Sequence, residues 1–189
     1  MSEFEEYGPA EPASPEMAAK LAVNRTGRLT SGQRQTALIA GVVALGLLLC
    51  PLALLIQLGA LLLSQGVTLS AGAIVAGAAV LGFFAIFAGI IYTNVSLFLP
   101  EAFSDRPVRW ARGPLQIHMS AGNRPELPFS YVIGDYSFAP YIAPPDVEMR
   151  PGAPYLVYYS ARSRLLLSLL ALDAPDADRW QPEIDDPSR

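Results

Sequence analysis

The feature of this sequence that most constrains its fold is the stretch from position 35 to position 100, which contains no Asp, Glu, Lys or Arg. All charged residues of the chain, 13 basic and 17 acidic, lie outside it. Charged residues are 16% of the whole chain, against roughly 25% in ordinary soluble domains, and this stretch accounts for the difference. The composition therefore excludes an ordinary soluble globule, a fully disordered chain and a protein made only of membrane helices.

The uncharged stretch consists of two apolar segments, residues 36–63 and 71–99, separated by a short polar segment. Each is longer than the roughly 20 residues that a helix needs to cross a hydrocarbon core of about 30 Å. A helix on the surface of a soluble protein would carry charges on one face, and neither segment has any. We therefore expect two transmembrane helices, at 36–63 and 71–99, that turn back on each other as a hairpin.

Basic residues lie outside both ends of the predicted hairpin, and the loop between its helices has none. The residues concerned are Lys20, Arg25, Arg28 and Arg34 before it and Arg106, Arg109 and Arg112 after it. Because basic residues are retained on the cytoplasmic side of membranes, we expect an integral protein of the cytoplasmic (plasma) membrane with both termini cytoplasmic. The three arginines after the hairpin are expected to contact lipid headgroups.

Small residues recur along one stripe of the second predicted helix, at Ala78, Gly82, Ala85 and Gly89. Their spacings of four, three and four put them on one helix face, where small side chains let helices approach closely. Gly41 belongs to a shorter stripe on the first helix, and an antiparallel pair would bring it opposite Gly89 or Ala85. Two uses of these residues remain open: packing within the hairpin, or a seam with a second copy or another membrane protein.

The two flanks of the chain have the composition of disordered segments. Residues 1–19 contain five glutamates and three prolines, and residues 20–35 are basic. Residues 173–189 contain six acids, two bases and three prolines. Segments of this kind bury too little apolar surface to form a core. We expect residues 1–35 to be an acidic, then basic, disordered juxtamembrane tail, and residues 173–189 to be a disordered acidic tail.

Residues 101–172 are the only segment expected to fold as a soluble domain. Several short runs there alternate between two sets of residues with a period of two, the pattern of strands, and the run at 155–160 is rich in residues that favour strands. The runs are Val108–Trp110, Leu115–Met119, Phe129–Ile133, Tyr155–Ser160 and Leu165–Leu170. About five short strands in roughly 70 residues suit a small barrel or a curled sheet.

The predicted fold class is thus a membrane protein with a two-helix transmembrane hairpin followed by a small, mostly β soluble domain. The soluble domain is expected to be an SH3-like or OB-like barrel or a curled sheet. Residues 162–172 also fit a helix, because a short apolar run does not separate strand from helix by its pattern alone. A helix there would make the domain α+β.

Eight aromatic side chains lie within residues 129–159. They have two interpretations: the core of a small sheet, which needs large side chains to bury enough area, or an exposed face that binds a ligand. The candidates for such an interaction face are Tyr131, Tyr136, Tyr141 and Tyr158. The core interpretation is favoured.

The sequence has no arrangement typical of catalysis or of metal binding. His118 is the only histidine and stands on the polar side of a predicted strand, without an oriented partner for general-base work. Cys50 is the only cysteine and falls inside the first predicted helix. We therefore expect no enzyme activity, cofactor or metal. Seven arginines and six acids within 101–172 are too evenly balanced to favour nucleic acid.

Two functions fit this layout. The first is a non-enzymatic integral membrane protein, a scaffold, that anchors a small β-domain at the cytoplasmic face for interaction with a protein partner or a lipid surface. The alternative is an accessory subunit of a larger membrane transporter or membrane enzyme complex, packed through the small-residue stripe of its second helix. The expected partners are the membrane, through two spans, and a protein partner or a second copy of the chain, with no nucleic acid.

Overall fold

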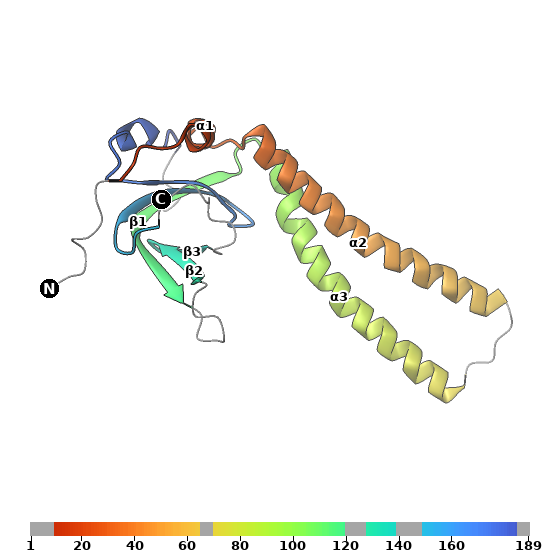
Figure 1. Ribbon diagram of the computed structural model, residues 1–189. Helices are drawn as coiled ribbons and strands as arrows, with labels where there is room; N and C mark the ends of the chain where they lie inside the picture. The colour runs from red at the N-terminus through yellow and green to blue at the C-terminus, as the bar shows by residue number, and fades with distance from the viewer. Residues whose placement is uncertain (1–9, 65–69, 120–127, 139–148, 185–189) are drawn as a thin grey trace. The chain divides into compact units, whose positions relative to one another are not determined.

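The computed structural model describes residues 10–64, 70–119, 128–138 and 149–184, and the chain forms two compact units (Figure 1). Gln35–Phe103 is one, called here the hairpin unit. The described residues before Gln35 and after Phe103 form the other, called here the sheet unit. The hairpin unit is thus inserted into the sequence of the sheet unit.

The hairpin unit is built from two long helices, α2 at Ser31–Ser64 and α3 at Ala71–Phe103. Both are long and apolar enough to cross a membrane. They run antiparallel, because Gly41 near the start of α2 contacts Leu99 near the end of α3. Each helix extends beyond the apolar segment predicted from the sequence, α2 back to Ser31 and α3 forward to Phe103, since backbone hydrogen bonding continues past the point where hydropathy changes.

The sheet unit contains one antiparallel sheet of five described strands in the order β3-β2-β1-β4-β5. The strands are β1 at Val108–Met119, β2 at Pro128–Ile133, β3 at Tyr136–Phe138, β4 at Pro154–Ser160 and β5 at Leu166–Ala171. β5 resolves the ambiguity of residues 162–172 in favour of a strand. Two runs expected as separate strands, Val108–Trp110 and Leu115–Met119, are joined in β1.

β1 changes partner along its length. Its first part, from Val108 to Pro114, pairs with β4, and its second part, from Leu115 onward, pairs with β2. The backbones come very close at the change, since a Cβ on Gly113 would lie 2.6 Å from the Cα of Gly134. Gly134 also has a φ of 59°, in the two-residue turn between β2 and β3, a conformation that favours glycine.

The sheet curls so that its two halves face each other. The rings of Tyr136 and Phe138 on β3 lie 5.0 and 5.6 Å, centroid to centroid, from the ring of Tyr159 on β4, although β2 and β1 separate these strands in the sheet. The order of the described strands is linear, with β3 and β5 at the edges. The described strands therefore confirm the small antiparallel sheet expected from the sequence.

β4 and β5 are buried on both faces. Every residue of β4 after Pro154, and every residue of β5, is buried. Alternate residues of a strand point to opposite faces, so Tyr155, Val157 and Tyr159 pack inside the curl, while Leu156 and Tyr158 pack on the outer face. The outer face therefore needs a cover of its own.

The two flanking segments supply that cover. Helix α1, Pro15–Asn24, and the short helix η3, Ala177–Trp180, lie on one side of the sheet (Figure 1). They pack Met17, Leu21 and Trp180 onto the outer face. The expectation of disordered flanks is therefore wrong for residues 10–34 and 173–184. Residues 1–9 and 185–189 of the predicted tails lie outside the described residues.

Local signals explain why α1 forms despite its composition. The hydroxyl of Ser14 accepts a hydrogen bond from Met17 N at 3.2 Å, and Pro15 follows it in the first turn, a standard helix start. Glu16 and Lys20 form an ion pair one turn apart at 2.8 Å. Met17 and Leu21 lie four residues apart on the buried face. The amino-acid composition of the segment does not reveal these signals, because they depend on where individual residues stand.

Candidate functional site

The hairpin unit carries apolar side chains all round its helices. Leu54 on α2 is 66% exposed and Phe83 on α3 is 74% exposed, and large exposed side chains continue along both helices. Neither helix has a polar face, in contrast to a surface helix of a soluble protein. A surface of this kind needs a cover of lipid or of protein.

The start of α2 packs closely against the end of α3. A Cβ on Gly41 would lie 3.0 Å from Cδ1 and 3.3 Å from Cα of Leu99, so glycine permits this approach. The sequence predicts Gly89 or Ala85 as the partner of Gly41, and this is wrong, because Leu99 occupies that place. Ala37 and Ala44, which flank Gly41 on the same stripe, are buried.

The small-residue stripe of α3, namely Ala78, Gly82, Ala85 and Gly89, is exposed. A Cβ on Gly82 or Gly89 would meet no atom of another described residue within 4 Å beyond its own helix. The face of α3 that points toward α2 is formed by the half-buried Phe84 and Ala88. Each is one residue before a member of the stripe, so this face is rotated from the stripe by about 100°. The stripe therefore does not pack within the hairpin.

An apolar groove lies between the two helices in the half of the hairpin beyond Pro51. Its volume is about 300 Å³. The lining residues are Pro51, Leu54, Leu55, Leu58, Val80, Phe83 and Phe84. Figure 1 shows α2 and α3 separating in this half. The groove offers no polar group for orienting a ligand, which distinguishes it from most small-molecule sites.

The predicted tyrosine face is not a single surface. Tyr158 is 0% exposed, and its hydroxyl donates a 2.7 Å hydrogen bond to Trp180 O under the outer cover. Burial raises the pKa of Tyr158 above its ordinary range. Tyr131 and Tyr136 are half-buried against the opposite cluster, inside the curl. Tyr141 lies outside the described residues. The strand alternation that puts Tyr158 on the outer face separates it from the others.

The three predicted headgroup arginines lie in different settings. Arg109 and Arg112 are exposed on β1, and the Arg112 guanidinium lies 4.9 Å from the centre of the Trp110 ring. Arg106 precedes β1 and joins Arg28 and Arg34 around a recess of about 540 Å³ that Asp105 also lines. In the sequence, the basic residues before and after the hairpin form two separate groups, whereas the fold brings Arg106 of the second group to Arg28 and Arg34 of the first.

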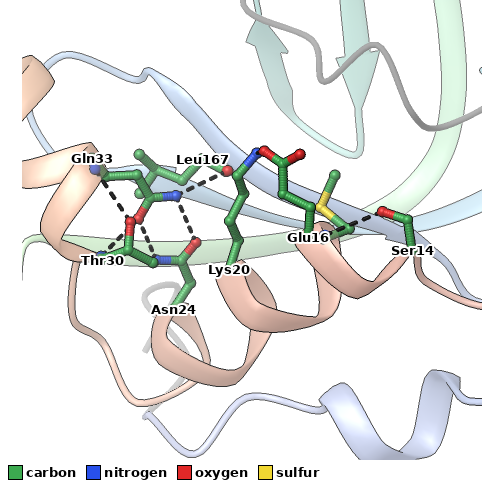
Figure 2. A network of polar contacts seen from close by, with 8 residues as sticks. Ser14, Glu16, Lys20, Asn24, Thr30, Gln33 and Leu167 are labelled. Atoms are coloured by element: carbon green, nitrogen blue, oxygen red, sulfur yellow. Dashed lines mark hydrogen bonds and ion pairs between the residues drawn. The ribbon is translucent and has the colours of Figure 1, made fainter.

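A buried amide network ties the start of α2 to the sheet (Figure 2). Asn24, at the end of α1, exchanges two hydrogen bonds with the side chain of Gln33, at 2.8 and 3.1 Å. Gln33 also donates to Leu167 O at 3.1 Å, and the Ser168 hydroxyl donates to Asn24 Oδ1 at 2.9 Å. Asn24 is 0% exposed. Polar groups so buried are stabilising only when they are fully paired, as they are here.

Gln33 has a second role as part of a helix cap (Figure 2). Its backbone N donates to the Thr30 hydroxyl at 3.2 Å, and its side-chain oxygen accepts from Thr30 N at 2.9 Å. This reciprocal pair is a capping box, which fixes where a helix begins. The first helix of the hairpin is therefore capped by residues that are hydrogen-bonded to β5.

The segments before and after the hairpin are also joined directly. Val108 N donates to Gly27 O at 3.2 Å, and Glu183 N donates to Arg25 O at 2.9 Å. The Arg25 guanidinium pairs with the Glu183 carboxylate and donates to Arg179 O at 2.6 Å. The two ends of the hairpin are thus connected through one folded unit.

No catalytic arrangement is visible in the part of the chain that the structure describes. His118 is exposed on β1, opposite Ser130 of β2. Across the described ranges, no three or more His, Cys, Asp or Glu side chains gather as metal ligands would. Cys50 is exposed on α2. Comparison with protein-family models, with curated proteins and with solved structures finds no match for this chain.

Proposed function

We propose that this chain is a non-enzymatic integral membrane protein whose hairpin unit anchors the sheet unit at the cytoplasmic face, for interaction with a protein partner or a lipid surface. The observation that carries the proposal is the exposure of large apolar side chains on all sides of α2 and α3. Apolar surface costs roughly 25 cal/mol per Å² when it is left in water. Such a hairpin is unfavourable in water and favourable in a bilayer.

The construction of the sheet unit supports a hairpin that enters and leaves on one side. Residues on both sides of the hairpin belong to this unit, and Gly27 and Val108 are directly hydrogen-bonded. Two ends tied together in this way cannot lie on opposite sides of a bilayer. The basic residues around them favour the cytoplasmic side.

Cysteine labelling in intact cells tests both insertion and orientation. In a Cys50→Ser background, Ser64→Cys places a thiol at the end of α2, and Ala161→Cys places one in the exposed turn after β4. A membrane-impermeant maleimide is expected to label the first variant and not the second until the cells are opened. The reverse pattern would contradict the orientation.

Extraction with alkaline carbonate tests insertion separately. The full chain is expected to remain in the membrane pellet, since two spans are not released when peripheral contacts are broken. Release of the intact chain into the supernatant would overturn the proposed function.

A second function is favoured by the exposed stripe of Ala78, Gly82, Ala85 and Gly89, which has the spacing of a helix-packing seam. In this function the chain is an accessory subunit of a larger membrane transporter or enzyme complex. Changing Gly82 and Gly89 to Leu together should then abolish co-purification of a membrane partner. Gly77→Leu is the matched control, because Gly77 is equally open and lies off the stripe. An unchanged set of co-purified proteins would exclude this second function.

A further inference from the structure

We propose that the recess lined by Arg28, Arg34 and Arg106 binds the phosphate group of an anionic membrane lipid. The inference rests on the proposed function, because the recess meets membrane lipids in the cell only if the hairpin unit is inserted in a bilayer. It names a ligand chemistry for the sheet unit and replaces the predicted headgroup set of Arg106, Arg109 and Arg112 with a different one.

The recess brings together side chains that are far apart in the sequence. Arg28 precedes α2, and Arg34 lies in the first turn of α2. Arg106 follows α3. They line a space of about 540 Å³ together with Asp105. A second recess of about 380 Å³ is lined by Arg28 and Arg106 as well. Arg28 and Arg106 therefore line two recesses, each large enough for a phosphate and its ester oxygens.

The guanidinium groups of the three arginines make no contact that stabilises the described fold. Among the described residues, no ion pair or side-chain hydrogen bond engages the guanidinium of Arg28, Arg34 or Arg106. Two arginines of the sheet unit do have partners: Arg25 pairs with Glu183, and Arg150 binds both carboxylate oxygens of Asp173 at 2.7 Å. Three guanidinium groups against one carboxylate leave the recess positively charged, and the fork of an arginine matches the geometry of phosphate.

The backbone that carries Arg28 and Arg106 is held in place before any ligand binds. Gly27, next to Arg28, has a φ of 85° and accepts the hydrogen bond of Val108 N, two residues beyond Arg106. The capping box of Thr30 and Gln33 fixes the other end of the Arg28 segment. A site whose supporting backbone is already ordered loses less entropy on binding.

The position of the recess along the chain favours a lipid over a soluble phosphate. Arg34 is three residues before Ala37, or about 4.5 Å along a helix, and Arg106 lines the same recess as Arg34. The headgroup layer is roughly 5–7 Å thick on each side of the hydrocarbon core. If the apolar segments span that core, Arg34 and Arg106 lie at the depth of lipid phosphates.

Native mass spectrometry of the full chain in a mild detergent tests the assignment. The detergent-purified protein is incubated with short-chain phosphatidate, phosphatidylglycerol or phosphatidylcholine, and bound lipid is counted. We expect one anionic lipid to be retained over phosphatidylcholine. The R28Q/R106Q variant should weaken that retention by about 10- to 30-fold, the effect of two surface cations on an anionic headgroup.

The matched control is R109Q/R112Q, which removes the same charge from exposed arginines outside the recess. It should change retention less than about twofold, and tryptophan fluorescence should report a folded sheet unit in both variants. Equal loss in the two variants would overturn the proposal in favour of unspecific attraction. Equal retention of phosphatidylcholine, or full displacement of the lipid by millimolar inorganic phosphate, would also overturn it. Failure here with a chain that still resists carbonate would leave the proposed function standing.

Discussion

The two units of this protein are rich in the same apolar residues and place them in opposite ways. In the hairpin unit, Ile56 and Ile86 are 63% and 70% exposed, whereas in the sheet unit all of β5 is buried. The difference shows how far each unit covers its apolar side chains with residues of its own. The sheet unit takes a cover for both faces of β4 and β5 from α1, η3 and its own curl, and the hairpin unit leaves its cover to its surroundings.

Because both tryptophans of the chain, Trp110 and Trp180, lie in the sheet unit, tryptophan fluorescence follows the unfolding of this unit without a signal from the hairpin. This property makes the comparison between the units measurable in the full chain.

Trp180→Ala should give the largest effect, because it removes the main side chain of the outer cover. Trp180 is 4% exposed, and its indole N–H donates to Asp176 at 2.7 Å. We expect the free energy of unfolding of the sheet unit to fall by about 3–5 kcal/mol, measured in denaturant through Trp110. Trp180→Phe is the control and should cost less. A loss below about 1 kcal/mol would show that the C-terminal segment is not part of the cover.

Ile86→Arg should disturb the hairpin unit without affecting the sheet unit. Ile86 is 70% exposed on α3, and a charge at the centre of a span costs about 2.5–3.5 kcal/mol of insertion free energy. The fraction of chain that resists carbonate should therefore fall sharply, while Ile86→Leu leaves it unchanged. Equal resistance of the two variants would mean that this surface does not face lipid.

The pair Asn24→Ala and Asn94→Ala compares an asparagine from each unit. Asn24 is buried, and its loss would leave Gln33 and Ser168 with unpaired groups. The expected cost to the sheet unit is about 1–3 kcal/mol. Asn94 is exposed on α3 and donates only to Ile90 O, so Asn94→Ala should leave the fluorescence transition where it is. A shift in both variants would show that the units do not unfold independently.

Raising the pH should weaken the sheet unit, by a smaller amount. The pKa of Tyr158 is raised by burial in the folded unit, so folding disfavours the ionised phenolate. The contribution of the protonated Tyr158 to the free energy of unfolding is therefore fully present below the ordinary tyrosine pKa of about 10, and it falls as the pH rises above that value. At neutral pH, Tyr158→Phe should lower the free energy of unfolding by about 0.5–1.5 kcal/mol, because it removes the hydrogen bond to Trp180 O. Between pH 9 and 11 the free energy of unfolding should fall less in Tyr158→Phe than in the wild type. Equal falls in the two proteins would contradict this account.

The parts of the fold that follow from local pattern were predictable. The uncharged stretch predicts both long helices, and the period of two predicts the strands. The cover of the sheet was missed, although two signals for it exist in the sequence. Ser14-Pro15-Glu16 is a helix start, and the mostly apolar runs of β4 and β5 require a layer on each side. The overall composition of the flanks predicts disorder in spite of these two signals, since it averages over the few positions that make long-range contacts.

The candidate site was less predictable than the fold. Arg106 was identified from the chain alone, but its companions Arg28 and Arg34 lie on the other side of the hairpin, and only the folded sheet unit brings them together. Tyr158 was misassigned for the same reason, since the face it occupies is set by its neighbours in space.

The interruption of the sheet unit by the hairpin has a consequence for synthesis. The ribosome completes α1 long before β5, so Met17 and Leu21 have no strand to pack on while the two apolar helices emerge. The sheet unit can close only after the hairpin unit has been synthesised. Assembly of this protein is thus ordered by its own chain, and a fragment beginning after Phe103 lacks α1 and would expose the apolar groups of β4 and β5 that α1 covers.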